Sequence, residues 1–364
     1  MPVSKFLAEV AAGKAGRNIG ISTGIPKLDK IIYGIQKRYI YTIGADTSGG
    51  KTSFALDVFV YNLLKNSGDK KISILYYSFE MSSEALYAKL LSLYIWDTYG
   101  EIITFSDILS FENVISDKNY LLVQAATDWL QELSLHLTIY DTPLTPGGIY
   151  ATCKEWLKRF GIFEQVSEHK EEFIEFDPDE YKVALMDHVG LIGGPDTTKI
   201  KIDNVVKYGI HFRNKCGMSW VFIQQMNRNA KSVERKAGGY ENYQLDDFKD
   251  TSGTTDGSEV VIALYFPYRE KIARCAGYPI QSTLKKRFRL CQVLKNRYGQ
   301  ADVNIGLSFF GEIGMFRDMP LPVDIIDYEP YLNLICKKVD KIDQIEKDEK
   351  EKNKENKNEY TFTL

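Results

Sequence analysis

Residues 45–52 read Ala-Asp-Thr-Ser-Gly-Gly-Lys-Thr, so a lysine and a hydroxyl side chain follow directly on two glycines. The stretch fits the pattern G-x-x-x-x-G-K-[ST], except that Ala45 stands in place of the first glycine. In this pattern, successive backbone N–H groups and a helix N-terminus bind phosphates, the lysine meets the β- and γ-phosphates, and the hydroxyl ligates Mg²⁺. The sequence therefore predicts a site for ATP and Mg²⁺ made of Ala45, Asp46, Thr47, Ser48, Gly49, Gly50, Lys51, Thr52 and Ser53.

Five apolar runs are predicted to be the strands that position such a site. They cover residues 39–45, 72–79, 182–187, 219–224 and 290–297. Near-continuous apolar strands that alternate with helical patterns indicate an α/β fold, with a mostly parallel twisted sheet and helices on both faces. Ligands of such sheets bind beyond the carboxyl ends of the strands. We therefore expect the polar residues that end these five strands to lie at one edge.

Three polar residues follow the middle strands of this set. Asp187 ends its strand where a P-loop protein needs a carboxylate for the magnesium shell, and a turn or N-cap aspartate is the alternative. Glu80 can orient the attacking water as a base, or it can simply be an acid before the next helix. Gln225 carries an amide that both donates and accepts hydrogen bonds, so it can sense the γ-phosphate.

Lys295 and Arg297 alternate along the last strand, so their side chains point to the same face. At a subunit interface they would reach the nucleotide of a neighbouring subunit as trans-acting cations. Ordinary surface charge is the alternative interpretation of both residues.

The composition is that of a globular protein, with 44% apolar and 26% charged residues in a chain of 364. No uncharged apolar run reaches 18 residues, and the apolar part of the N-terminus is too short for a secretory signal. The five cysteines are scattered without a C-x-x-C pair, and the four histidines show no metal-binding spacing. These features predict a cytoplasmic protein with no membrane contact and no structural zinc.

The net charge of −3 excludes a globally basic coat protein, so any contact with nucleic acid must come from local basic segments. One such segment follows Gln225 and another follows Asp187, and both are predicted to be loops beside the nucleotide site. Their basic residues are Arg228, Lys231, Arg235, Lys236, Lys199 and Lys201. Solvated loops with the usual lysines and arginines are the alternative.

The order of the motifs resembles the motor domain of DnaB-type hexameric replicative helicases. The resembling stretches are "TGIPKLDKIIYGIQKRYIYTIGADTSGGKTSFAL", "YYSFEMSSEALYAKLLS", "LMDHVGLIG", "FIQQMNR", "DDFKDTSGTTDGSEVVIALYF" and "VLKNRYGQ", and they span roughly residues 20 to 317. The resemblance implies a RecA-like P-loop ATPase core. It also implies a ring, expected to be a hexamer, that surrounds single-stranded DNA and couples ATP hydrolysis to translocation during replication.

The resemblance gives the candidate residues their roles. Lys51 and Thr52 bind phosphate and magnesium, Asp187 serves the magnesium, and Glu80 positions or activates water. Gln225 links the γ-phosphate state to the DNA loops, and Arg297 with Lys295 is similar to the trans-acting finger pair of the family. The stretch from Lys249 through Asp250 to Gly253 resembles the loop that grips the DNA backbone. That loop departs from the family in having Lys249 instead of arginine and in being one residue longer.

The chain is divided by these patterns into an N-terminal arm or linker helix (1–20), a RecA-like ATPase domain (21–330) and a charged tail (337–364) that is predicted to be disordered. A helical, polar region is predicted from 96 to about 180. We expect no N-terminal collar domain before the motor, and "SKFLAEVAAG" is expected to be the helix that docks on a neighbouring subunit. Expected partners are single-stranded DNA, further copies of the chain, and a helicase loader, primase or other replication protein in a bacterial or phage-infected cytoplasm.

Three other functions share parts of this pattern. A RecA-like recombinase that pairs strands in a filament would use the same phosphate loop, Asp187 and mobile loops. A P-loop phosphotransferase for a small molecule would leave the basic segments and Arg297 unexplained. A degenerate ATPase kept as a scaffold would not need Lys51, Thr52, Glu80 and Asp187.

Overall fold

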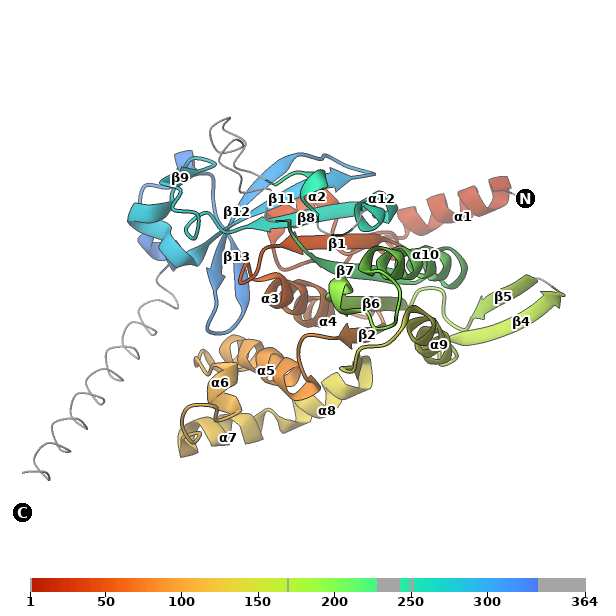
Figure 1. The fold of residues 1–364 in the computed structure, drawn as a ribbon, viewed down its shortest axis with the longest axis horizontal. Coiled ribbons are helices and arrows are strands. Elements are labelled where there is room, and N and C mark those ends of the chain that lie inside the picture. Colours follow the sequence, from red (N-terminus) through yellow and green to blue (C-terminus); the bar gives the residue numbers. More distant parts are fainter. Residues whose placement is uncertain (1, 169, 228–242, 249, 251, 333–364) are drawn as a thin grey trace, which may run out of the picture.

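The computed structural model of the chain describes residues 2–168, 170–227, 243–248, 250 and 252–332. Its centre is a nine-stranded sheet with the strand order β13-β12-β11-β8-β1-β7-β6-β2-β3 (Figure 1). The strands are β1 Ile40–Ala45, β2 Ile72–Ser78, β3 Leu137–Tyr140, β6 Tyr181–Asp187, β7 Ser219–Gln225, β8 Val260–Tyr265, β11 Phe288–Asn296, β12 Val303–Phe310 and β13 Met315–Asp318. All five apolar runs of the sequence are thus strands of one sheet.

The strands from β8 to β3 form a parallel sheet. Every residue of β1, β2, β6 and β8 is buried, which is why their sequences are near-continuous apolar runs. Because these strands are parallel, their carboxyl ends meet at one edge of the sheet. The predicted α/β class with a mostly parallel sheet is confirmed.

The remaining strands of the sheet are antiparallel. β11 pairs antiparallel with β8, so that Leu290 lies opposite Tyr265 and Asn296 lies opposite Val260. β12 and β13 continue this antiparallel part. The carboxyl end of β11 therefore lies at the amino edge of the parallel strands, and the expectation that all five strand ends share one edge is wrong for this strand.

The connection between β8 and β11 explains the reversal. A parallel neighbour requires a crossover to the opposite edge, usually through a helix packed on the sheet. The connection here is irregular, and β11 starts opposite the end of β8. It consists of β9 Arg274–Cys275, β10 Tyr278–Pro279, the turns η5 Ile280–Leu284 and η6 Lys285–Arg287, and the segments between them.

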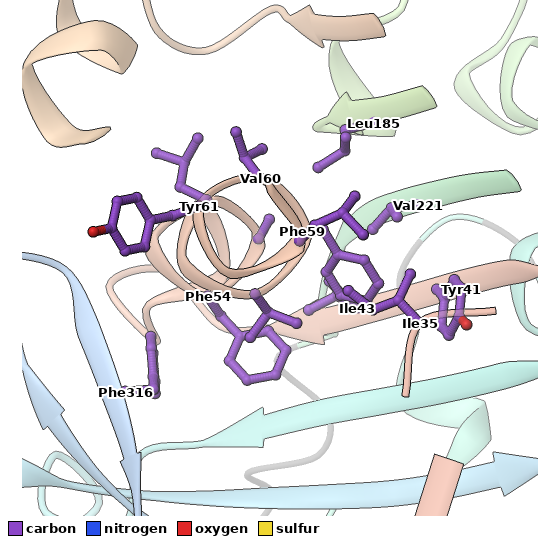
Figure 2. Close-up of a cluster of buried hydrophobic side chains, with 14 of the residues drawn as sticks. Ile35, Tyr41, Ile43, Phe54, Phe59, Val60, Tyr61, Leu185, Val221 and Phe316 are labelled. Atoms are coloured by element: carbon purple, nitrogen blue, oxygen red, sulfur yellow. The ribbon is translucent and has the colours of Figure 1, made fainter. Parts of the chain in front are cut away.

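Helices cover both faces of the sheet (Figure 1). On one face a helix beginning at Lys51 packs Phe54 and Phe59 against Ile43 of β1 (Figure 2). On the other face Leu157 and Phe212 pack against Trp220 of β7. The α-helices are α1 Pro2–Lys14, α2 Pro26–Ile32, α3 Lys51–Leu56, α4 Asn62–Lys65, α5 Ser83–Tyr99, α6 Phe105–Ile108, α7 Asp117–Ala125, α8 Thr127–His136, α9 Pro146–Leu157, α10 Thr198–Cys216 and α12 Gly253–Gly257.

Shorter helical elements complete the chain. A π-helical turn, η1 Asp57–Tyr61, joins α3 to α4, so that helical backbone runs from Lys51 to Lys65. Besides η6, the 3₁₀ turns of the described residues are η2 Val189–Leu191, η4 Leu245–Asp247 and η7 Pro322–Asp324.

A two-stranded hairpin projects from the body after α9 (Figure 1). It consists of β4 Gly161–Ser167 and β5 Lys170–Glu175, which pair antiparallel. The prediction of helical structure from 96 to about 180 is therefore correct for α6, α7, α8 and α9, and wrong for β3 and for the hairpin. The cross-strand pair Phe163–Phe173, with ring centroids 4.7 Å apart, stabilises the hairpin. The glutamates on either side of these phenylalanines make the strands hard to recognise from the sequence.

The N-terminal arm contains the helix α1, and the charged segment 337–364 lies outside the described residues. Among the helices of the described ranges, none combines the length and the apolar character needed to cross a membrane.

Candidate nucleotide-binding site

The loop between β1 and α3 has the form expected of a phosphate-binding loop. β1 ends at Ala45, and α3 begins at Lys51 after Gly50, which caps the helix in a left-handed conformation with φ 97°. The Gly49 N–H donates to the Asp46 carbonyl oxygen at 2.9 Å, which curls the loop back on itself. The free N–H groups of the first helical turn therefore point out of the loop, as anion binding requires.

Gly50 is constrained by its neighbours as well as by its backbone angle. A Cβ atom at this position would lie 3.1 Å from the Phe316 ring, which belongs to β13. The Phe309 ring stacks on Phe316 with centroids 4.4 Å apart. Aromatic rings of the antiparallel strands thus pack directly against the phosphate loop, and only glycine fits at position 50 without displacing them.

Lys51 and Glu80 face each other across the loop. Lys51 is buried, and its Nζ lies 3.6 Å from the Glu80 Oε2, whose side chain is 44% exposed. Glu80 stands just beyond β2, at the carboxyl edge of the parallel strands. An ammonium group and an accessible carboxylate are therefore held together where the sequence predicts the γ-phosphate and the attacking water.

Asp187 lies at the bottom of the same site. It is the last residue of β6 and is 1% exposed, and its Oδ2 accepts a hydrogen bond from the Tyr76 hydroxyl at 3.3 Å. Burial raises the pKa of Asp187 to about 6, although the hydrogen bond from Thr52 and the charge of Lys51 favour the ionised form.

Asp187 and Thr52 together form a candidate magnesium site, because the second carboxylate oxygen of Asp187 is available as a ligand. Within the described part of the chain, Asp187 Oδ1 is buried and has no hydrogen-bond partner. Mg²⁺ prefers oxygen ligands, and it is usually bound by one or two protein oxygens together with substrate phosphates and water. The unpaired carboxylate oxygen and the Thr52 hydroxyl beside it fit that requirement.

Gln225 reaches the phosphate loop from the neighbouring strand. It ends β7 opposite Ala45 of β1, and its Nε2 donates to the Thr47 hydroxyl oxygen at 2.9 Å. The preceding residue, Gln224, accepts a hydrogen bond from Thr254 in α12. The end of β7 is thus bonded both to the phosphate loop and to the segment that starts at Gly253.

Two arginines that the sequence did not predict also bind the phosphate loop. Arg269, four residues beyond β8, donates to the Thr47 carbonyl oxygen and lies 3.8 Å from Asp46 Oδ2. Arg289 of β11 is buried, and its Nε donates to the Gly49 carbonyl oxygen at 2.9 Å. Arg269 could have been predicted from the sequence as a site residue, because it is a charged residue shortly after an apolar strand. Arg289 could not, because it lies inside a strand and carries no such signal.

Lys295 and Arg297 lie away from all of these residues. Since β11 is antiparallel, both stand at the amino edge of the parallel strands, opposite to the phosphate loop. Lys295 Nζ donates to the carbonyl oxygens of Thr255 at 2.8 Å and Asp256 at 3.0 Å, and Arg297 pairs with Glu259 at 2.9 Å. They cannot reach the nucleotide site of their own subunit.

Most of the predicted DNA-binding residues belong to segments that the structure does not describe. Arg228, Lys231, Arg235, Lys236 and Lys249 lie outside the described residues. Asp250 is exposed and lies beside Gly190, which follows Asp187 by three residues, and Gly253 begins α12.

The second basic segment differs from its prediction. Lys199 and Lys201 stand in the first turn of α10, which is capped by Thr197, and not in a loop. The Gly-Gly-Pro run ends at Pro195, two residues before that cap, so the helix starts earlier than the loop composition indicated.

Known proteins are similar to this chain in sequence and in fold. Residues 20–162 match the family model of the DnaB-like helicase C terminal domain, which includes the phosphate loop and Glu80. This part of the chain is thus similar to the C-terminal domain of DnaB-like helicases. A solved ATPase domain of another protein has a similar fold, with a TM-score of 0.66, 18% identity, and coverage of 87% of this chain and 99% of that domain. The predicted RecA-like architecture is thereby confirmed.

The curated proteins that this chain resembles extend beyond the regions that it matches. The replicative DNA helicase DnaB of Rickettsia prowazekii is 23% identical over 86% of this chain and 59% of its own length. That of Rickettsia bellii is 33% identical over 26% of this chain and 20% of its own length. A solved structure of a DnaB-like replicative helicase, described with its interactions with primase, has a TM-score of 0.64 and 17% identity, over 88% of this chain and 67% of that one. The chain spans between a fifth and three fifths of the length of these two curated relatives.

Proposed function

We propose that this chain is an ATP-driven motor that moves along single-stranded DNA and unwinds duplex DNA during replication. The observation that carries the proposal is the division of the ATPase residues between two edges of the sheet. Lys51, Glu80 and Asp187 gather at the carboxyl edge, whereas Arg297 stands at the amino edge. A complete site then requires two subunits, as in a ring that hydrolyses ATP at its interfaces.

Exposed apolar faces support the association of subunits. α1 exposes Val3, Phe6, Leu7 and Val10, whose spacing puts them on one side of the helix. Phe111, Val114, Tyr120 and Leu121, between the end of α6 and the middle of α7, are exposed as well. An uncovered apolar stripe on a helix is a feature of protein interfaces. We infer that α1 docks on a neighbouring subunit and that the ring is a homohexamer.

The residues of the carboxyl edge have separate roles in this proposal. ATP binds with its phosphates in the loop 46–50, where Lys51 neutralises charge on the β- and γ-phosphates. Thr52 and Asp187 hold Mg²⁺, which supplies charge stabilisation when it is bound. Glu80 orients and deprotonates the attacking water, because its carboxylate is accessible and lies beside Lys51.

Arg297 of the adjacent subunit completes the site. Its guanidinium stabilises the charge that develops on the transferred phosphoryl group, and Lys295 supports it from the same strand. Loss of the γ-phosphate changes the contact between Gln225 and Thr47, and α12 is tied to the neighbouring residue Gln224. That chain of contacts couples hydrolysis to the predicted DNA-binding residues between 228 and 253.

Replication supplies the context of the proposed activity. The relatives named above are replicative DNA helicases, which favours unwinding over strand pairing. Primase and a helicase loader are the partners that this role implies, and cytoplasm is the corresponding location.

The steady-state ATPase rate, measured with and without single-stranded DNA, tests the proposal. We expect DNA to stimulate the rate, and we expect Glu80→Gln to lower kcat by about 10² to 10⁴-fold, as for loss of a general base. Glu84→Gln, in the first turn of α5, is the matched control and should keep the wild-type rate. Unwinding of a forked duplex by the wild type then separates a helicase from a strand-pairing filament. An ATPase rate that is indifferent to DNA would contradict the proposal.

A further inference from the structure

Glu259 is a buried carboxylate that binds two arginines at the amino edge of the sheet. It directly precedes β8 and is 2% exposed. Its Oε1 accepts hydrogen bonds from Arg213 Nη1 at 2.6 Å and from Arg297 Nη1 at 2.9 Å. Its Oε2 accepts from the Ile40 backbone N–H at 2.7 Å. Both oxygens are therefore held, and the carboxylate is fixed relative to β1.

The backbone ties the same residues together a second time. The Glu259 N–H donates to the Ile40 carbonyl oxygen at 2.9 Å, and the Arg297 N–H donates to the Glu259 carbonyl oxygen at 2.8 Å. Arg297 is thus anchored through its main chain and its side chain to a single residue. That residue directly precedes the strand that pairs with β1, which leads into the phosphate loop of the same subunit.

Arg213 of α10 supplies the second positive charge. A buried carboxylate that loses its counter-ion is strongly destabilised, so a carboxylate with a single partner would be a poor anchor for a residue that must also serve another site. Arg213 is 16% exposed in its side chain, and Arg297 is 43% exposed. The more buried arginine therefore neutralises Glu259, while the more exposed one faces the surface.

The guanidinium of Arg297 keeps free donors for a ligand. It has five N–H groups, and in the described part of the chain only Nη1 takes part in a side-chain hydrogen bond. We propose that Glu259 is a positioning residue that holds Arg297 through Nη1 and leaves Nη2 and Nε to receive the γ-phosphate of the adjacent subunit. A catalytic cation that is already fixed in position before the subunits associate loses less conformational entropy on association than a mobile side chain does. This inference rests on the proposed trans-acting role of Arg297.

Kinetics of Glu259→Gln test the positioning role first. The variant retains an acceptor of the same shape but loses the charge that holds two guanidinium groups. We expect kcat to fall about 10- to 100-fold, the size of effect that a misplaced catalytic group produces, while the KM for ATP changes less than about twofold. Glu175→Gln removes a carboxylate that pairs with the buried Lys182, and it is the matched control with an expected wild-type rate.

Mixed rings separate positioning in trans from a structural role within one subunit. Lys51→Ala disables the nucleotide site of a subunit but leaves its Glu259 and Arg297 intact. Co-expression with Glu259→Gln, followed by purification through two tags, creates interfaces where an intact site meets an intact amino edge. We expect these mixed rings to be at least several-fold more active than either variant alone. A structural defect of Glu259→Gln in its own nucleotide site would give no such recovery, and that result would overturn the inference.

Mixtures of Lys51→Ala with Arg297→Ala distinguish failure of the inference from failure of the proposed function. Recovery with Arg297→Ala but not with Glu259→Gln would sink the role of Glu259 and leave the trans-acting arginine standing. No recovery of activity in either mixture would contradict both the positioning role of Glu259 and the trans-acting role of Arg297. If thermal melting shows that Glu259→Gln is unfolded, Arg213→Gln is used in its place. We expect the same loss of kcat in Arg213→Gln and a recovery of kcat in Arg213→Lys. An unchanged kcat in Arg213→Gln would then contradict the proposal.

Discussion

The guanidinium of Arg289 donates a hydrogen bond from Nε to the carbonyl oxygen of Gly49, in the middle of the phosphate loop, at 2.9 Å. Its flat faces lie against two aromatic rings, with the guanidinium carbon 3.5 Å from the centroid of Phe266 and 4.7 Å from that of Phe309. Burial lowers the pKa of Arg289 to about 9, so that it remains charged at neutral pH. The antiparallel part of the sheet therefore supports the phosphate loop through a buried, charged hydrogen-bond donor.

Replacement of Arg289 by lysine tests this brace. Lysine keeps the charge but lacks the planar group that stacks between two rings and bonds in a fixed direction. We expect Arg289→Lys to raise the KM for ATP about tenfold and to lower the free energy of unfolding by about 1 to 3 kcal/mol. Steady-state kinetics and urea unfolding measure the two effects.

Arg287 provides the matched control for that substitution. It is buried to a similar extent, two residues earlier in the chain, but it pairs with Glu312 and faces the Phe310 ring. Arg287→Lys should therefore reduce stability while leaving the KM for ATP unchanged. An equal rise in KM for both variants would mean that general loosening of the antiparallel strands, and not the Gly49 contact, supports the loop.

Lys51 is expected to dominate nucleotide affinity. It is the buried cation at the start of α3, and a charge-assisted hydrogen bond to phosphate contributes about 1.5 to 3 kcal/mol, which is roughly a 10- to 100-fold change in Kd. Lys51→Ala should weaken binding of a fluorescent ATP analogue by that factor. Lys65→Ala, at the far end of the same helical segment where the lysine pairs with Asp97, should bind the analogue like the wild type.

Asp187 is expected to reduce stability at neutral pH in the absence of magnesium. Its pKa is about 6 in the folded chain and 3.8 as an ordinary aspartate, so the folded state binds the proton more tightly. Stability from this group is fully present below pH 3.8 and is lost as the pH rises to about 6. Asp187→Asn should therefore be more stable than the wild type above pH 6, by roughly 2 to 3 kcal/mol, and the advantage should shrink toward pH 4.

Thermal melting in EDTA at several pH values measures this difference. Asp128→Asn, which changes an exposed aspartate on α8, should follow the wild type at every pH. A difference between Asp187→Asn and the wild type that does not depend on pH would contradict the buried, proton-binding carboxylate. Mg²⁺ with a non-hydrolysable nucleotide should raise the melting temperature of the wild type more than that of Asp187→Asn.

Gln225 is expected to matter for coupling more than for folding. Its hydrogen bond to Thr47 joins two neutral groups and contributes only about 0.5 to 1.5 kcal/mol. Gln225→Ala should therefore keep most of the basal ATPase rate and lose most of the stimulation by single-stranded DNA. Thr47→Val removes the same bond from the other side, so a double variant that loses no more stimulation than either single variant would assign the effect to this contact. Full stimulation by single-stranded DNA in Gln225→Ala would exclude a role of Gln225 in coupling.

Short-range features of the chain were predictable from the sequence. The phosphate loop is made of consecutive residues whose glycines, lysine and threonine act through local backbone geometry, and the loop stands where the sequence predicts it. The strands that lead to Glu80, Asp187 and Gln225 were equally clear, because a parallel strand buried on both faces must be apolar along its length.

Other features were decided only by the tertiary structure. The hydrogen bond from Arg289 to Gly49 joins residues 240 positions apart, and nothing in the local pattern of a strand indicates which distant loop its side chain will contact. The direction of β11 depends on the irregular connection from 266 to 287, which has no helical crossover to enforce a parallel strand. That direction places Arg297 at the edge opposite to Lys51. The sequence by itself therefore determined which residues have the chemical groups that ATP hydrolysis needs, while the packing of the antiparallel strands decided that Lys295 and Arg297 do not join Lys51, Glu80 and Asp187 at one edge.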